Sequence, residues 1–299
     1  MLQSLKKGWL SLIAAFAGLA VAGCATAAPE TREGPALWRV ADEDTSIYLF
    51  GTIHTLPEGV AWRTPRIEQA IAASDELVTE IALGADETPS ATAMMRLGIA
   101  RDLPPILERV PAERREALRQ AIAGTGIPIA VYDRMKTWTA ALTIAAFAFR
   151  QAGLDPEQGV DRRLSAAFSE RRRRLSGLET LEEQLGFFDN LSEEEERAFL
   201  QGVLETPAEI RGEFDQMLAA WLSGDTAAIA RTFDDETTIS PQLREALMTR
   251  RNERWAAWLR RRLEQPGTVF VAVGAGHLAG RDSVQAMLER AGLSVERVQ

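Results

Sequence analysis

The chain has 299 residues, a formal net charge of −9 at pH 7, two histidines and a single cysteine. An acidic surface offers no general attraction to phosphate backbones, so we exclude nucleic acid as a partner. A lone cysteine cannot form an internal disulfide. The fold must therefore be stabilised by a hydrophobic core, for which the chain is long enough.

The first 23 residues predict a bacterial signal peptide. Lys6 and Lys7 precede an apolar stretch at residues 8–20 that is too short to span a membrane. Residues 21–24 then read VAGC, which has the form of a lipobox. The only cysteine of the chain, Cys24, therefore stands where a lipid is attached in bacterial lipoproteins.

We predict an exported lipoprotein that is acylated at Cys24 and contacts the membrane through this lipid anchor, with residues 24–35 as a polar tether. Ala25 follows the cysteine, rather than the aspartate that commonly retains lipoproteins in the inner membrane. This predicts a periplasm-facing protein of the outer membrane. Ordinary cleavage within residues 25–27 is the alternative, and it predicts a soluble periplasmic or secreted protein.

Residues 36–299 predict one α/β domain in which a small mixed sheet carries the site. Short apolar or β-branched runs predict strands at Leu37–Val40, Ser46–Phe50, Glu76–Leu83, Arg173–Gly177, Thr268–Val273 and Ser294–Val298. Apolar residues at helical spacing predict a large helical insertion at about residues 88–265, interrupted by the segment that contains Glu179. Within it, residues 137–149 predict a buried core helix rather than a membrane span.

Both histidines end the same short motif. His54 ends GTIH at residues 51–54, His277 ends GAGH at residues 274–277, and each motif follows an apolar run that predicts a buried strand. Histidine is the usual metal ligand and the usual acid or base near neutral pH. Ligands of open α/β sheets bind beyond the carboxyl ends of the strands. We therefore expect the two imidazoles within about 8 Å of each other, close enough to share one metal ion.

Two glutamates, Glu80 and Glu179, lie at or just past other predicted strands. Two imidazoles with one or two carboxylates form a plausible donor set for a divalent transition metal. We predict His54, Glu80 and His277 as metal ligands that also act in catalysis. Glu179 would position or deprotonate the attacking water.

Structural alternatives remain open for several of these residues. Glu80 interrupts an apolar strand, and an arginine such as Arg251 could neutralise it. Glu179 could cap the helix that starts near Thr180, and Asp161 could be an ordinary residue of a helix N-terminus. We also keep Arg251 and Asp161 as candidate substrate-binding residues.

Short motifs follow one another in a specific order along residues 36–298: GTIH (51–54), ELVxE (76–80), GVD (159–161), GLET (177–180), RNxxW (251–255) and GxGHL (274–278). Together they resemble the TraB/PrgY/GumN family. That family is similar to the animal TIKI proteins, described as metal-dependent proteases, and is linked to the erythromycin-esterase and ChaN-like superfamily. The resemblance implies catalytic or metal positions at His54, Glu80 and His277, and Glu179 as the next residue to belong to the same site.

The leading expectation is an exported metal-dependent hydrolase, most readily a peptidase, with manganese or cobalt as its metal by analogy with TIKI. A metal-free hydrolase that uses histidine as base, as the esterase relatives suggest, is the second reading. The third is a non-catalytic lipoprotein that captures a peptide or haem in the same cleft. The partner in each case is a peptide or a small molecule.

Overall fold

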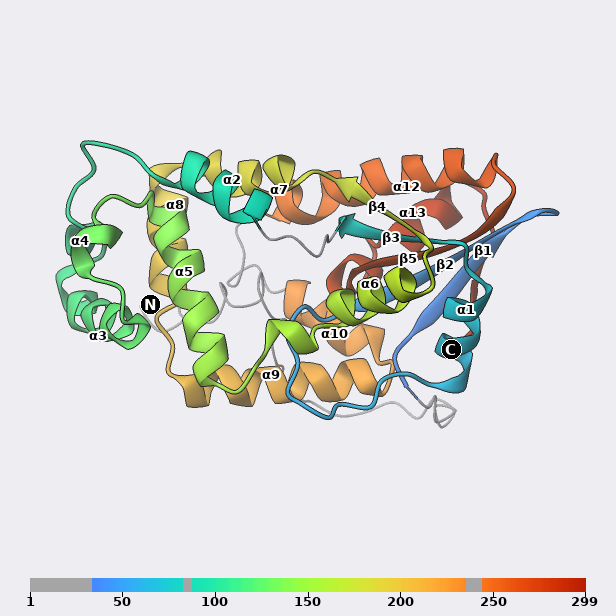
Figure 1. The fold of residues 1–299 in the computed structure, drawn as a ribbon, viewed down its shortest axis with the longest axis horizontal. Coiled ribbons are helices and arrows are strands. Elements are labelled where there is room, and N and C mark those ends of the chain that lie inside the picture. The colour runs from blue at the N-terminus through green and yellow to red at the C-terminus, as the bar shows by residue number, and fades with distance from the viewer. Residues whose placement is uncertain (1–33, 83–87, 235–243) are drawn as a thin grey trace.

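The computed structural model describes residues 34–82, 88–234 and 244–299, and the strands of these ranges form one mixed sheet (Figure 1). The sheet has the order β4-β3-β5-β2-β1-β6. Its strands are β1 Leu37–Ala41, β2 Thr45–Thr52, β3 Glu76–Ile81, β4 Arg174–Glu179, β5 Gly267–Gly274 and β6 Val295–Arg297. Strands β4, β3, β5 and β2 run parallel, whereas β1 is antiparallel to both β2 and β6. The predicted α/β class with a small mixed sheet is confirmed.

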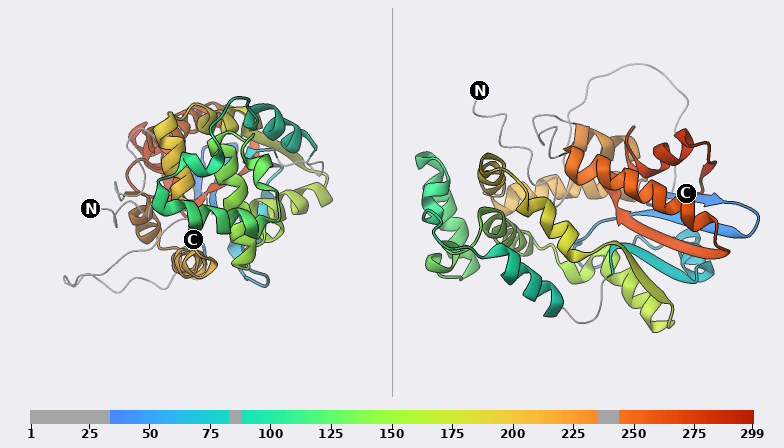
Figure 2. Two further views of the ribbon diagram at one scale, coloured as in Figure 1. Left: turned by 90° about the vertical axis from the view of Figure 1, so that its left-hand side faces the viewer. Right: turned by 90° about the horizontal axis from the view of Figure 1, so that it is seen from above.

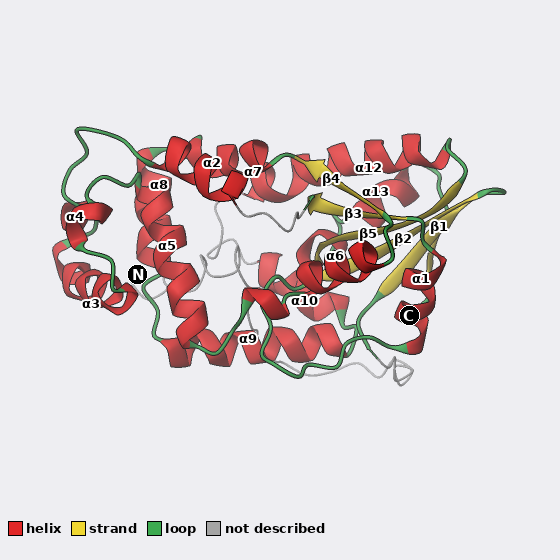
Figure 3. Ribbon diagram, in the orientation of Figure 1, coloured by secondary structure: helices red, strands yellow, loops and turns green. Residues whose placement is uncertain are grey.

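Helices cover both faces of this sheet (Figure 3). The helices are α1 Pro65–Ala73, α2 Thr88–Gly98, α3 Arg115–Thr125, α4 Ile129–Tyr132, α5 Thr137–Gln151, α6 Val160–Glu170, α7 Leu181–Asp189, α8 Glu193–Gly202, α9 Pro207–Leu222, α10 Thr226–Asp234, α12 Arg250–Leu263 and α13 Val284–Arg290. Shorter helical turns lie at η3 Ile106–Arg109, η4 Ala112–Arg114, η5 Pro156–Gln158, η6 Glu245–Thr249 and η7 Ala275–Leu278.

The alternation of side chains along β5 explains why its sequence is apolar without a break. Val269, Val271 and Val273 point into a core shared with α12 and α13, whereas Phe270 and Ala272 point into a core shared with α1 and α6. A parallel strand covered on both faces needs apolar residues at every position. The sheet is thus the middle of three layers.

Most of the chain between β3 and β5 is helical and extends away from one end of the sheet (Figure 2). This helical part is interrupted by β4, the strand that contains Glu179. Helix α5 has a buried apolar face, as the sequence predicted for residues 137–149. Among the described residues, no helix is long and apolar enough to cross a membrane. The signal peptide predicted at residues 1–23 and Cys24 lie outside the described residues.

One strand boundary differs from the prediction in a way that matters for the site. The sequence predicts a strand that ends at Gly177, but β4 continues to Glu179. The cap of the next helix is Thr180, whose hydroxyl accepts from the backbone N–H of Glu183 at 3.1 Å. Glu179 is therefore the last residue of a strand and not the cap of a helix.

The parallel pairing brings four strand ends to one edge of the sheet. Thr52 of β2 lies opposite Gly274 of β5, and Ile81 of β3 lies opposite Glu179 of β4. The residues that follow these ends must meet there, because neighbouring strands are only about 4.8 Å apart.

Candidate functional site

His54 lies in a loop that backbone hydrogen bonds fix against the start of α6. Leu56 and Asp155 exchange backbone hydrogen bonds of 3.2 and 3.0 Å, and the N–H of Val160 donates to the carbonyl of Ile53 at 2.9 Å. Gly159 lies between these contacts, where any Cβ would collide with the carbonyl oxygen of His54. The GVD motif therefore needs its glycine so that the loop can approach the helix.

The first turn of α6 supplies the partner of His54. Asp161 is buried, and one of its oxygens accepts from Nδ1 of His54 at 2.7 Å. Its other oxygen accepts from the hydroxyl of Thr52 at 2.8 Å. The attraction of Asp161 raises the pKa of His54 to about 9, although burial alone would lower it. The His54 side chain remains 52% exposed, so its second nitrogen, Nε2, is open to a ligand.

Glu80 enters the site from β3 as a carboxylate. Its Oε1 accepts from the backbone N–H of Gly274 at 2.7 Å. Its Oε2 accepts from Arg251 at 2.6 Å and from the side-chain amide of Gln184 at 2.9 Å. Burial alone would raise the pKa of Glu80, but the positive charge of Arg251 and the nearby imidazoles hold it well below its usual range. This carboxyl group stays ionised at any physiological pH.

Glu179 and Arg251 lie behind Glu80 rather than beside the ligand space. The Glu179 side chain is 2% exposed. Its oxygens accept from Arg251 at 2.8 to 3.1 Å, from Arg254 at 2.9 Å and from Gln184 at 3.3 Å. Arg251 is buried too, with its guanidinium 4.6 Å above the ring of Trp255. The geometry therefore favours a structural role for Glu179 and Arg251 over the predicted roles in activating water and binding substrate.

His277 lies in η7, directly after β5, and two polar side chains fix its ring. The amide of Asn252 donates to the carbonyl of Asp282 at 2.8 Å, so its oxygen faces Nδ1 of His277 at 2.6 Å. Nε2 of His277 lies 3.1 Å from a guanidinium nitrogen of Arg251. Burial and then the positive charge of Arg251 lower the pKa of His277 to about 3. His277 is therefore neutral, with its proton on Nδ1 and its Nε2 lone pair accepting from Arg251.

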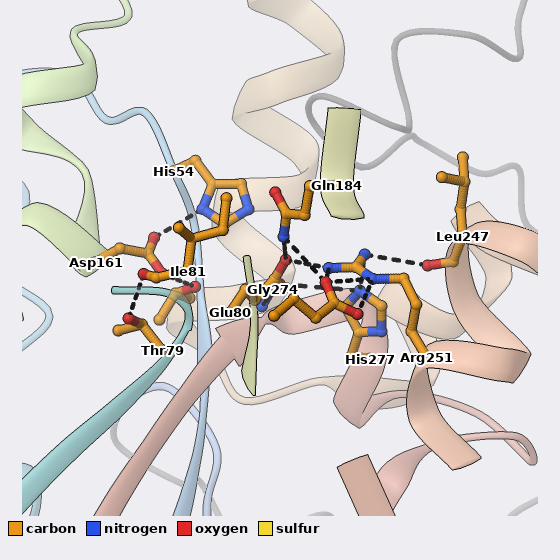
Figure 4. A network of polar contacts seen from close by, with 12 residues as sticks. His54, Thr79, Glu80, Ile81, Asp161, Gln184, Leu247, Arg251, Gly274 and His277 are labelled. Atoms are coloured by element: carbon orange, nitrogen blue, oxygen red, sulfur yellow. Dashed lines mark hydrogen bonds and ion pairs between the residues drawn. The ribbon is translucent and has the colours of Figure 1, made fainter. Parts of the chain in front are cut away.

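A cavity of about 280 Å³ opens onto this edge of the sheet. Its walls come from the ends of β2 and β3, from η5, α6 and α7: His54, Thr79, Glu80, Ile81, Pro156, Asp161, Arg162 and Gln184. Figure 4 shows His54 and Asp161 on one side of Glu80, and Arg251 and His277 on the other. The cavity thus gives a ligand access to His54 and Glu80, whereas Glu179, Arg251 and His277 do not line it.

The two imidazoles nevertheless approach the same point. A Cβ added to Gly274 would lie 3.2 Å from Oε1 of Glu80, 3.6 Å from Cδ2 of His277 and 3.7 Å from Nε2 of His54. These distances bring the two rings within the separation of about 8 Å that one metal centre would require. The structure therefore brings together the three residues that the sequence predicts as metal ligands.

Their orientation does not fit a three-ligand metal centre as the side chains stand. Nε2 of His54 and Oε1 of Glu80 face the position above Gly274, whereas Nε2 of His277 lies 3.9 Å from Oε1 of Glu80. The Nε2 lone pair of His277 is already taken by Arg251. Among the described residues, no group of three or more histidine, cysteine, aspartate or glutamate side chains is placed to hold a metal ion.

Three residues of the site were not predicted from the sequence. Gln184 joins Glu80 to Glu179, Asn252 orients His277, and Arg254 covers Glu179. Asn252 follows Arg251 within the RNxxW motif, which was the one signal that could have found it. Gln184 lies in an acidic helix where nothing in the local pattern sets it apart.

The fold and the site define a class: a mixed α/β domain with a large helical insertion and a polar site at the carboxyl ends of its parallel strands. The model of the TraB/PrgY/gumN family matches residues 36–297, and the chain belongs to this family.

Two relatives illustrate the range of this similarity. The uncharacterized protein YbaP of Escherichia coli (strain K12) is 27% identical over 244 residues, which cover 81% of this chain and 87% of YbaP. An uncharacterized protein of Treponema pallidum (strain Nichols) is 21% identical over 268 residues, which cover 83% of this chain and 78% of that protein. No solved structure matches the chain.

Proposed function

We propose that the protein is a hydrolase of peptide or ester substrates in which His54 acts as general base toward water. One observation carries this proposal. Nδ1 of His54 is bonded to the buried carboxylate of Asp161, while Nε2 is open to a cavity that Glu80 also lines. A histidine oriented by a carboxylate on one nitrogen, with the other nitrogen facing a ligand, is the arrangement that proton transfer requires.

Each residue of the cavity has a chemical task in this reaction. Asp161 holds the ring of His54 in one orientation and stabilises the imidazolium that forms when His54 accepts a proton. Glu80 stays ionised and accepts a hydrogen bond from the attacking water. Arg162 lines the same cavity and supplies a positive charge for the oxygen that becomes negative during attack.

A metal-dependent form of the same hydrolysis has one observation in its favour, the convergence of His54 Nε2 and Glu80 Oε1 on the point above Gly274. It requires Arg251 to release Nε2 of His277, which lies 3.9 Å from Oε1 of Glu80, whereas Nδ1 can keep its bond to Asn252. The manganese or cobalt expectation therefore stays a prediction. In that form His54, Glu80 and His277 would hold an ion that polarises the carbonyl and activates water.

The test is turnover of a fluorogenic peptide pool and a pool of aryl esters by the purified protein, with metal content measured after mild dialysis. We expect turnover that survives dialysis against chelator and is lost in His54→Ala. Activity that appears only after manganese or cobalt is added would favour the metal-dependent form. Absence of turnover in both pools, with or without metal, would favour a non-catalytic protein that binds a peptide or haem.

We propose further that the protein is exported and anchored to the outer membrane through a lipid on Cys24, because the signal-like segment ends in a lipobox. Several acyl chains anchor a protein firmly, whereas one chain binds only marginally. The test is Cys24→Ser followed by membrane fractionation. Variant protein that remains in the membrane would place the anchor elsewhere, and wild-type protein that is already soluble would indicate ordinary signal cleavage.

A further inference from the structure

Gln184 of α7 reaches the candidate site with an amide whose orientation is fixed by its neighbours. Its Nε2 lies 2.9 Å from Oε2 of Glu80 and 3.3 Å from Oε2 of Glu179. Glu80 stays ionised and can only accept, so the end of the amide that faces it must be the NH2 group. Turning the amide over would place its oxygen against two carboxylate oxygens.

The oxygen of this amide is therefore left for the cavity. Gln184 lines the cavity together with His54 and Glu80, and Figure 4 shows its side-chain oxygen turned away from Glu80. Among the described residues, no hydrogen bond reaches this oxygen. Asp161 in the same wall differs, because its two oxygens accept from Thr52 and His54. Oε1 of Gln184 is thus an acceptor that a bound molecule can use.

The charge balance of the site does not explain why this side chain is an amide. Arg251 pairs with Glu80 at 2.6 Å and with Glu179 at 2.8 Å. Arg254 adds a second cation at 2.9 Å from Glu179. The two arginines already balance the two carboxylates, and an amide adds no charge. What Gln184 brings to the cavity is one neutral acceptor, which suits an N–H donor.

A peptide substrate carries such donors next to the bond that is cut. Consecutive Cα atoms are about 3.8 Å apart, so a scissile carbonyl bound at His54 and Glu80 has flanking amides near Gln184. We propose that Oε1 of Gln184 accepts a hydrogen bond from a backbone N–H that flanks the scissile bond, and that the site thereby selects peptides over simple esters. This inference rests on the proposed hydrolytic function and names its substrate class.

The physical basis of this selection is the cost of an unpaired acceptor. A bound substrate displaces water from the cavity, so Oε1 of Gln184 needs a donor from the substrate itself. An ester oxygen in place of the N–H would face it with a second lone pair. A site that is built to bind a substrate N–H discriminates strongly against the analogue that lacks it.

A set of depsipeptides measures the contact with the wild-type protein. Each analogue of a fluorogenic peptide keeps the scissile amide and replaces one flanking N–H with oxygen, so the bond that breaks is the same in all. We expect one analogue to lose about 10- to 100-fold in kcat/KM, the cost of leaving a buried acceptor unpaired. Equal turnover of all analogues would overturn the proposal and leave the hydrolytic function intact.

Gln184→Lys then assigns the effect to this side chain, because lysine can donate to Glu80 and Glu179 but has no acceptor. The parent peptide should lose more than the sensitive analogue does, so that the two substrates are turned over with nearly equal kcat/KM. If Gln184 only supported the two carboxylates, every substrate would lose alike. An unchanged ratio between the two substrates in Gln184→Lys would therefore overturn the proposal.

Gln151→Lys is the matched control. Gln151 is an exposed glutamine at the end of α5 whose amide donates to the carbonyl of Gly124 at 3.2 Å, and it does not line the cavity. This variant should keep the wild-type ratio between the parent peptide and the sensitive analogue. If wild type and His54→Ala are equally inactive on the parent peptide, the hydrolytic function itself fails, and this inference fails with it.

Discussion

The two GxxH motifs of this protein end in opposite chemical environments, although they follow neighbouring parallel strands. His54 is 52% exposed, and Asp161 raises its pKa to about 9. His277 is 6% exposed, and burial together with Arg251 lowers its pKa to about 3. The motif therefore places a histidine at the end of a strand, but the partner of that histidine decides its charge.

The difference assigns different tasks to the two rings. His54 faces the cavity and changes charge within reach of a substrate, as an acid or base must. His277 stays neutral and holds Arg251 in place, and Arg251 in turn holds Glu80 and Glu179. In the proposed reaction one histidine acts as the base, and the other supports the buried charges beneath it.

The largest expected effect is on turnover. His54→Ala should lower kcat/KM about 10³- to 10⁴-fold, as loss of the base does in other hydrolases. His277→Ala should also abolish activity, but with a clear fall in unfolding temperature, because Arg251 and Asn252 each lose one buried hydrogen-bond partner. The double variant should lose little more than either single one. Losses that multiply would show that the two histidines serve separate steps.

The second expected effect is on stability. Arg251→Met leaves Glu80 and Glu179 buried without their main cation, which should cost about 3–5 kcal/mol in the free energy of unfolding. Arg254→Met is the matched control, because Arg254 is 53% exposed and its pairing with Glu179 is worth about 1 kcal/mol or less. Urea denaturation measures both values. Equal losses of unfolding free energy in the two variants would contradict the role of Arg251 as the main cation of the two buried carboxylates.

The third expected effect is on the pH profile. His54 must lose its proton to act as base, so kcat/KM should rise with pH and level off above about 9. Asp161→Asn removes the attraction that raises this pKa, so the midpoint should move down toward about 6.5. The maximal rate should fall about 10- to 100-fold, because the ring loses its orienting partner. A midpoint that does not move would show that Asp161 does not set the pKa of His54.

The smallest expected effect is on stability in mild acid. Folded His277 titrates near 3, whereas the unfolded chain takes up a proton near 6.5. Below pH 6.5 only the unfolded state is protonated at this site. Stability is therefore lost as pH falls, by up to about 1.4 kcal/mol per pH unit.

The comparison of wild type with His277→Gln between pH 6.5 and 5 isolates this effect. Unfolded His54 also takes up part of its proton in this window, but that contribution is common to wild type and variant and cancels in the comparison. The variant should lose less stability than wild type as the pH falls. Parallel curves would show that His277 is not held neutral by the fold.

The sequence predicts the strand ends well because the signals there are local. The apolar runs before residues 51–54 and 274–277 predict buried strands, and parallel strands must bring their carboxyl ends to one edge. The early end predicted for β4 has a local cause as well. Ser176 and Gly177 are weak strand formers, and only pairing with β3 extends the strand to Glu179.

The partners of the site residues could not be predicted in the same way, because they come from distant helices. Asp161 had the signal of an ordinary helix start, and nothing in its neighbourhood indicates that it faces His54. The open Nε2 of His54 and the occupied lone pair of His277 depend on Asp161 and Arg251, each more than 25 residues away along the chain. Side-chain orientation, unlike strand position, depends on tertiary contacts.

The opposite states of the two histidines can be measured directly, because the chain contains no others. Imidazole signals in an NMR titration from pH 4 to pH 10 give two curves, which His54→Gln assigns. We predict a pKa near 9 for His54, and a His277 signal that stays neutral, with its proton on Nδ1, down to the acid end of the titration. Two midpoints near 6.5, or a His277 that titrates above His54, would contradict the account.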